Sequence, residues 1–204
     1  MPENKLLIAL VSCRVDAVPE RQETRDALDQ ALVRWLVELG YQALLLPNAL
    51  DSSTLPSLVA QLNPALIVLS GGNDLGQYPS RDQTESALVD IARKLQLPLL
   101  AICRGMQLLA QCEGVALTTV AEHVARRHML SGLWQGEVNS YHQFGVTELP
   151  AHYQLLAQSP DGCIEAMCHQ SLPWLALMWH PEREQPFCPH DLNRVRAVLQ
   201  QEQR

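Results

Sequence analysis

Residues 99–107 read LLAICRGMQ, and this stretch decides the fold. A short apolar run stops at Cys103 and leads directly into apolar residues at helical spacing as far as Cys112. The pattern predicts a buried strand over residues 98–102 and a helix over residues 106–112, with the cysteine at the corner. Small residues two positions either side of the cysteine permit a sharp strand-to-helix turn, which would expose its side chain at the end of the strand.

The alternation of strand and helix continues on both sides of this corner. Toward the N-terminus we predict strands over 6–12, 41–46 and 65–69 and helices over 26–39, 53–62 and 83–95. This order predicts an α/β fold with a mostly parallel central sheet and helices on both faces. After Val115, shorter apolar runs at 136–138, 154–157, 164–168 and 175–179 predict antiparallel additions, a return to the main sheet and a closing helix over 191–201.

Composition narrows the functional classes. With 204 residues, 47% of them apolar, we expect a single domain over residues 1–204. The net charge of −7 argues against a nucleic-acid partner. The N-terminal apolar run is too short for a membrane span, and no signal peptide is evident. Six cysteines without CxxC pairs argue against a disulfide scaffold or a zinc site, so we expect a cytoplasmic protein.

A second segment, Trp179-His180-Pro181-Glu182, supports a catalytic role for Cys103. A cysteine nucleophile needs a histidine base and a carboxylate that orients it, and His180 follows an apolar run that predicts a strand. A helix N-terminus would also lower the pKa of the thiol. Alone, Cys103 is equally well read as a small core residue, and His-Pro-Glu as a surface turn. Together they favour a Cys103, His180 and Glu182 triad.

Three motifs carry a family resemblance: SGGNDL at residues 70–75, ICRGMQ at 102–107 and WHPE at 179–182. In order and spacing the chain resembles the class I glutamine amidotransferase superfamily, with its flavodoxin-like fold, and the γ-glutamyl hydrolase branch fits best. One departure is Ala101, where many relatives have glycine. The resemblance implies the same triad and an oxyanion hole made by backbone N–H groups of Gly72 and Arg104. It also implies substrate contacts, which we assign to Gly71, Asn73, Gln107, Ser140, Tyr141 and His142.

A narrower resemblance involves residues 23–30, 46–48, Tyr78 and 82–85. These segments are similar to γ-glutamyl-CDP-amidate hydrolases, which release cytidine diphosphoramidate and glutamate during phosphoramidate decoration of bacterial surface polysaccharide. Under this interpretation Arg25 contacts a phosphate, since its planar guanidinium suits phosphate oxygens. The alternative is a solvated arginine in the first turn of a helix, beside acidic neighbours.

Other interpretations stay open. The chain could be a glutaminase subunit that supplies ammonia to a separate synthase, or could hydrolyse another γ-glutamyl amide such as γ-glutamyl-γ-aminobutyrate. It could also be an inactive binding module, or a redox sensor using Cys103. The predicted partner is a small γ-glutamyl substrate, with a nucleotide-linked form as the narrower option, and a homodimer stays open.

No cofactor is expected, and no metal site. His123 and His128 are five residues apart, so they would not share one face of a helix. Asp161-Gly162 is expected to form a hairpin turn.

Overall fold

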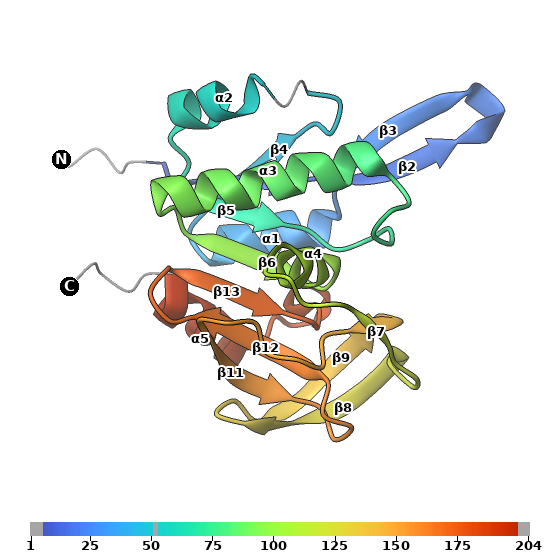
Figure 1. Ribbon diagram of the computed structural model, residues 1–204, viewed down its shortest axis with the longest axis vertical. Helices are drawn as coiled ribbons and strands as arrows, with labels where there is room; N and C mark the ends of the chain where they lie inside the picture. Colours follow the sequence, from blue (N-terminus) through green and yellow to red (C-terminus); the bar gives the residue numbers. More distant parts are fainter. Residues whose placement is uncertain (1–5, 51–52, 200–204) are drawn as a thin grey trace.

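A large mixed sheet organises the molecule. The computed structural model describes residues 6–50 and 53–199. Within these residues, nine strands form a sheet in the order β4-β1-β5-β6-β13-β12-β11-β8-β9 (Figure 1). In that order their bounds are Gln42–Leu46, Ile8–Ser12, Leu66–Leu69, Leu99–Ile102, Trp174–Leu177, Ile164–His169, Tyr153–Gln158, Val124–Gly132 and Gly136–Tyr141.

The pairing of the strands changes from parallel to antiparallel at β13. The strands from β4 to β13 pair in parallel, and those from β13 to β9 pair antiparallel. The α/β class, the mostly parallel core and the antiparallel additions in the second half are therefore confirmed. The hairpin turn between β11 and β12 is also confirmed, because Gly162 N–H donates to the Ser159 carbonyl oxygen at 3.0 Å.

Two apolar cores lie on opposite faces of the parallel strands. Side chains alternate along each strand, so that in β6 Leu99 and Ala101 belong to one core while Leu100 and Ile102 belong to the other. The first core packs against α2 (Leu55–Leu62), α3 (Pro79–Leu95) and α4 (Arg104–Cys112). The second packs against α1 (Gln30–Glu38) and α5 (Pro189–Leu199). Strands buried on both faces explain the continuous apolar runs of the sequence. The predicted end of α5 at Gln201 lies outside the described residues.

The predicted helix over 26–39 begins too early. Residues Arg14–Val18 and Glu23–Ala27 instead form β2 and β3, joined by a 3-10 turn at Pro19–Arg21. This hairpin projects from the body in Figure 1. The helix itself begins at Gln30, because the Asp29 side chain accepts the N–H of Ala31 at 2.8 Å and so caps α1.

The segment around His123 and His128 is also not helical. His128 lies in β8, which pairs with β9, and His123 immediately precedes that strand. The remaining short strands are β7 (Thr118–Thr119) and β10 (Phe144–Gly145), and a second 3-10 turn spans Pro181–Arg183. Among the described residues no helix is long and apolar enough to cross a membrane.

Candidate active site

Cys103 occupies a strained corner between β6 and α4. Its φ is 51° and its ψ −106°, in the left-handed half of conformational space that non-glycine residues rarely adopt. Its N–H donates to the Leu177 carbonyl oxygen of the neighbouring strand β13 at 2.7 Å. Gly105 is required here, because a Cβ at that position would overlap the Leu69 carbonyl oxygen. The expected sharp strand-to-helix turn, or elbow, is therefore present, and its cysteine lies at the end of a buried strand.

His180 follows β13 and reaches the same place. Its Nδ1 lies 2.6 Å from Oε1 of Glu182, and both side chains are buried. Burial alone would lower the pKa of His180, but interactions with Cys103 and Glu182 outweigh burial and raise the pKa to about 9. Asn139 of β9 holds the backbone on both sides, accepting the His180 N–H at 2.9 Å and donating to its carbonyl oxygen at 2.8 Å. Cys103, His180 and Glu182 are therefore close neighbours with the imidazole oriented between them.

The glycine loop after β5 passes directly beside this histidine. A Cβ on Gly71 would lie 2.7 Å from Cε1 of His180, so only glycine leaves room for the imidazole. Gly72 has a φ of 85°, a conformation that glycine adopts without strain. Gly71 was predicted to contact substrate; in the structure its clearest role is to make space for His180.

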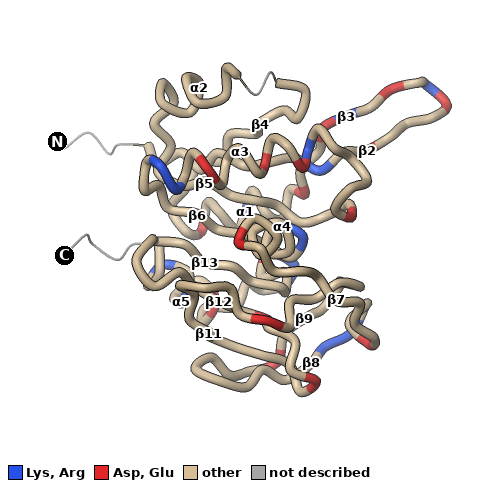
Figure 2. The backbone as a smooth tube through the Cα atoms, in the orientation of Figure 1, with Lys and Arg blue, Asp and Glu red and all other residues tan. Residues whose placement is uncertain are grey.

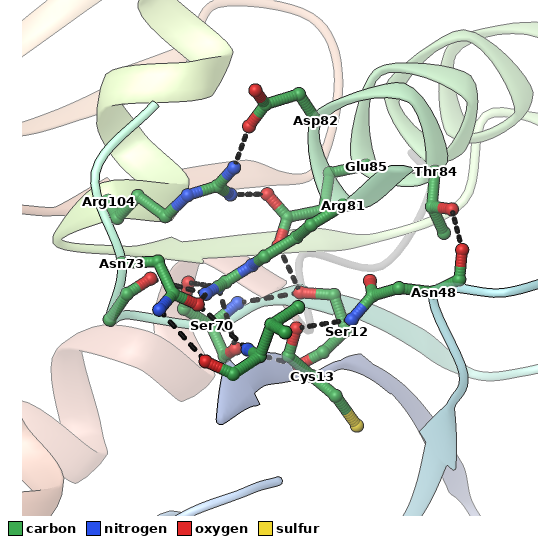
Figure 3. Close-up of polar contacts among 12 residues, drawn as sticks. Ser12, Cys13, Asn48, Ser70, Asn73, Arg81, Asp82, Thr84, Glu85 and Arg104 are labelled. Carbon is green, nitrogen blue, oxygen red and sulfur yellow. Dashed lines mark hydrogen bonds and ion pairs between the residues drawn. The ribbon is translucent and has the colours of Figure 1, made fainter. Parts of the chain in front are cut away.

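A buried arginine that the sequence analysis did not single out fixes this loop (Figure 3). Arg81 of α3 is completely buried, and its guanidinium donates to the carbonyl oxygens of Ser70, Gly71 and Gly72. Its Nε also donates to Glu85 at 2.9 Å. Burial lowers the pKa of Arg81 to about 10, so the group stays charged at neutral pH. Arg81 lies before the helix predicted over residues 83–95, so its i, i+4 spacing to Glu85 became visible only when α3 was found to begin at Pro79.

Arg104 is the first residue of α4, where backbone N–H groups have no acceptor within the helix. Its side chain turns away and pairs with Glu85 and Asp82, as Figure 3 shows. The backbone N–H of Arg104 is therefore at the corner beside Cys103, while the charge is neutralised behind it.

A cleft of about 290 Å³ opens at this corner. It is lined by Gly72, Asn73, Asp74, Gln77, Cys103, Arg104, Gln107, Tyr141, His142, Gln143, His180 and Arg183. Most of the predicted site residues thus surround one cleft. The sequence analysis did not single out Asp74, Gln77, Gln143 and Arg183: Asp74 and Arg183 adjoin predicted site residues, and Gln77 and Gln143 lie in loops without a sequence pattern.

Several predicted substrate contacts have other partners. The Asn73 amide pairs with the backbone of Val15, and Gln107 Nε2 donates to the Phe144 carbonyl oxygen at 2.7 Å. The Ser140 hydroxyl is buried, donates to the His123 carbonyl oxygen at 2.6 Å and does not line the cleft. Its side chain is therefore not available to a substrate, contrary to our prediction.

The side chains of Tyr141 and His142 differ in their accessibility to a substrate. Tyr141 is exposed, with its ring 6.0 Å from that of His180 and the Arg183 guanidinium 4.8 Å from its centroid. His142 borders the cleft but is buried, and its Nε2 points to a cluster of histidines behind it. Tyr141 is thus the more accessible of the two predicted contacts.

Arg25 lies on the projecting hairpin rather than on a helix, so the first-turn interpretation is wrong. It pairs with Glu23, and both side chains are about half exposed. It does not line the cleft. Arg14, on the other strand of the hairpin, is the nearer cation, because its side chain packs against Gly72. Figure 2 shows that the hairpin carries charges of both signs, and Arg14 itself pairs with Asp16.

Comparison with known proteins finds relatives that are named as γ-glutamyl hydrolases. The chain is 32% identical over 124 residues to a γ-glutamyl-CDP-amidate hydrolase of Campylobacter jejuni subsp. jejuni, a match covering 58% of this chain and 62% of that relative. It is 28% identical over 228 residues to a γ-glutamyl-γ-aminobutyrate hydrolase of Escherichia coli O157:H7, covering 88% and 86%. The match to the first relative therefore spans less than two thirds of its length.

Among solved structures, a glutamine amidotransferase from Thermotoga maritima superposes with a TM-score of 0.63. The superposition covers 98% of this chain and 86% of that one at 15% identity, which supports the fold alone. The family described as glutamine amidotransferase class-I matches residues 22–187, more than half of the sequence. The chain belongs to the class I glutamine amidotransferase family.

Proposed function

We propose that this protein hydrolyses a γ-glutamyl amide with Cys103 as nucleophile, His180 as acid and base, and Glu182 as the orienting carboxylate. The observation that carries the proposal is the convergence of two strand ends. Cys103 at its strained corner is hydrogen-bonded to the end of β13, and the imidazole that follows β13 is held by a buried carboxylate at 2.6 Å. A nucleophile, a histidine and an orienting carboxylate brought together in this way support the assignment of a cysteine amidohydrolase.

In this mechanism the Cys103 thiolate attacks the γ-carbonyl carbon. The oxyanion that forms accepts hydrogen bonds from the backbone N–H groups of Gly72 and Arg104. His180, whose pKa of about 9 keeps it protonated at neutral pH, gives its proton to the departing nitrogen as the carbon–nitrogen bond breaks. The neutral imidazole then takes a proton from water, which attacks the γ-glutamyl thioester, releases glutamate and returns the thiolate.

For the leaving group we propose cytidine diphosphoramidate. The relative from Campylobacter jejuni supports this choice, and so does the charge around the cleft. Arg14 packs against Gly72 on one side and Arg183 lies over the Tyr141 ring on another. Both are exposed and could meet a diphosphate. Arg25 lies further along the same hairpin, where it would contact only a substrate that extends from the cleft.

The test is glutamate release from three substrates: γ-glutamyl-CDP-amidate, γ-glutamyl-γ-aminobutyrate and free glutamine. We expect kcat/KM to be at least about 100-fold higher for the nucleotide amide, the equivalent of two good charge-assisted contacts. Preference for the aminobutyrate amide would remove the nucleotide proposal and leave the hydrolase. Preference for glutamine would instead support the role of a glutaminase that feeds a synthase.

Cys103→Ala should lower kcat by at least about 10³-fold while the far-ultraviolet circular dichroism spectrum stays unchanged. Substantial activity in this variant would overturn the nucleophile assignment. Cys112→Ala is the matched control, since that thiol is exposed and at the far end of the same helix.

Two hairpin variants test the diphosphate contact. Arg14→Ala should raise KM for the nucleotide amide about 10-fold and leave the aminobutyrate amide unaffected. Arg25→Ala should have a smaller effect in the same direction. If neither variant discriminates between the two substrates, the hairpin does not contact the leaving group.

A further inference from the structure

Four side chains, three buried and one partly buried, converge inside the antiparallel half of the sheet. His123 precedes β8, His128 lies in β8, His142 follows β9 and Glu165 lies in β12. The Glu165 side chain is completely buried, and those of the three histidines are between 1% and 12% exposed. None of these groups belongs to the proposed triad.

The ligand atoms of this cluster are close to one another. From Oε1 of Glu165 the distances are 3.5 Å to His123 Nδ1, 3.2 Å to His128 Nε2 and 3.5 Å to His142 Nε2. His123 Nδ1 and His142 Nε2 are 3.1 Å apart. Four ligands bound tetrahedrally at the usual zinc–nitrogen and zinc–oxygen lengths are separated by about 3.4 Å. The four separations above are within about 0.3 Å of this tetrahedral value. The ligand atoms of His123, His128 and Glu165 all lie within 4.8 Å of one another, and His142 approaches both His123 and Glu165.

The outer nitrogens of two imidazoles have acceptor partners that fix the position of their protons. His142 Nδ1 lies 3.0 Å from the Phe144 carbonyl oxygen, which can only accept. His123 Nε2 lies 3.0 Å from Oδ2 of Asp161, a carboxylate oxygen that also can only accept. Both imidazoles consequently place their protons on the outer nitrogens.

An imidazole that carries its single proton on the outer nitrogen presents a lone pair from its inner nitrogen, here toward the other imidazole and an acceptor-only carboxylate. His128 Nε2 and both carboxylate oxygens of Glu165 are buried without a well-formed hydrogen bond. Such a set of acceptors needs a positive charge at its centre. Imidazoles that bind a metal commonly donate their second N–H to a carboxylate or a backbone carbonyl, as His123 and His142 do.

A β-bulge explains how the two histidines of the first segment meet. His128 is five positions after His123, an odd offset that would place the two side chains on opposite faces of a regular strand. Ala125 has a φ of 53°, and the register with β9 skips it between Val124 and Arg126. The extra residue restores a common face. The metal site that we did not expect on a helix is therefore geometrically available on a bulged strand.

We propose that His123, His128, His142 and Glu165 bind one Zn²⁺ ion in a closed, structural site. A ligand set of three imidazole nitrogens and one carboxylate oxygen suits zinc among the common divalent cations. Because the protein fills all four positions, the ion stabilises the fold and does not activate water. It would join the segments around β8, β9 and β12, which are far apart in sequence.

The site is also connected to the cleft. The Phe144 carbonyl oxygen accepts from both His142 Nδ1 and Gln107 Nε2. A metal ion on His142 would thus fix the loop between β9 and β10 that forms one wall of the cleft.

The first test is metal content. Untagged protein produced with added zinc should contain about one equivalent of zinc per chain by plasma mass spectrometry after extensive dialysis. His128→Gln and Glu165→Gln should reduce zinc to less than about a tenth of an equivalent. The matched control is His190→Ala, an exposed histidine on α5 outside the cluster, which should retain full zinc.

Thermal unfolding provides a second readout that does not depend on activity. A strong chelator should lower the melting temperature of the wild-type and His190→Ala proteins and leave His128→Gln unchanged. If a variant fails to fold, the wild-type measurements still decide. Wild-type protein without zinc, and with a Kd for Zn²⁺ weaker than about 1 µM in competition with a chromogenic chelator, would overturn the proposal and leave a network of protonated histidines around Glu165.

Discussion

The substitution Gly71→Ala tests whether catalysis needs the space that Gly71 leaves beside His180. Gly71 is not in the left-handed region, so alanine can adopt its backbone conformation without strain. The added methyl group would lie 2.7 Å from Cε1 of His180, whereas ordinary contact begins at 3.4 Å. The imidazole must therefore retreat by about 0.7 Å, and a misplacement of about 1 Å in a catalytic group lowers the rate by about 10²-fold. We expect kcat to fall by about 30- to 100-fold, or about 2–3 kcal/mol of activation free energy.

The measurement is kcat on the best γ-glutamyl substrate, together with the rate of Cys103 alkylation by iodoacetamide against pH. The displaced imidazole should weaken its interaction with the thiol, so the alkylation rate should be lower than in the wild-type enzyme. Gly76→Ala is the control: Gly76 has a φ of 84° and nothing within 4 Å of an added methyl group, so backbone strain is present without the clash. A Gly71→Ala enzyme that keeps kcat within about threefold of the wild type would refute the spatial reasoning.

Two further predictions concern stability. Arg81→Met should lower the free energy of unfolding by about 3–5 kcal/mol, because it leaves three buried loop carbonyls without this donor and removes one of the two arginines that pair with Glu85. Urea unfolding checks this, and Arg126→Ala, which breaks an exposed ion pair, should change stability by less than about 1 kcal/mol. His180 predicts a pH dependence: its pKa is about 9 in the folded protein against 6.5 ordinarily, so its contribution is complete below pH 6.5 and is lost as the pH rises through 9. The free energy of unfolding should fall by on the order of 3 kcal/mol across that window. The fall should be smaller in Cys103→Ala, because that variant lacks one of the two groups that raise the pKa of His180.

The sequence predicts those parts of the fold and site that depend on local pattern. The buried strands ending at Ile102 and Leu177 are continuous apolar runs, and the residues after each strand end can be read directly. Because parallel strands place their carboxyl ends at one edge of the sheet, residues after both strands meet there. Without coordinates, Cys103 and His180 were assigned to one site from the chemistry of a triad and from the family resemblance, and this geometry agrees with that assignment.

The parts that could not be predicted depend on contacts between distant residues. Asp26 looks like a helical residue, but its carboxylate accepts from the backbone and side chain of Asn48, 22 positions away, and the segment becomes a strand. The bulge at Ala125 has no sequence signature, and it reverses which residues of β8 share a face. Arg81 reads as a surface arginine until the loop carbonyls that it binds are known.

The position of His180 depends on both halves of the sheet. β13 is the last parallel strand and the first antiparallel one, so the histidine that follows it borders both halves. The parallel half supplies Cys103 and the glycine loop. The antiparallel half supplies Asn139, which fixes both backbone polar groups of His180 from β9 at the far edge of the sheet. Changes that loosen β9 should therefore affect the imidazole before they affect the elbow, because the elbow is anchored to β13 by its own backbone hydrogen bond.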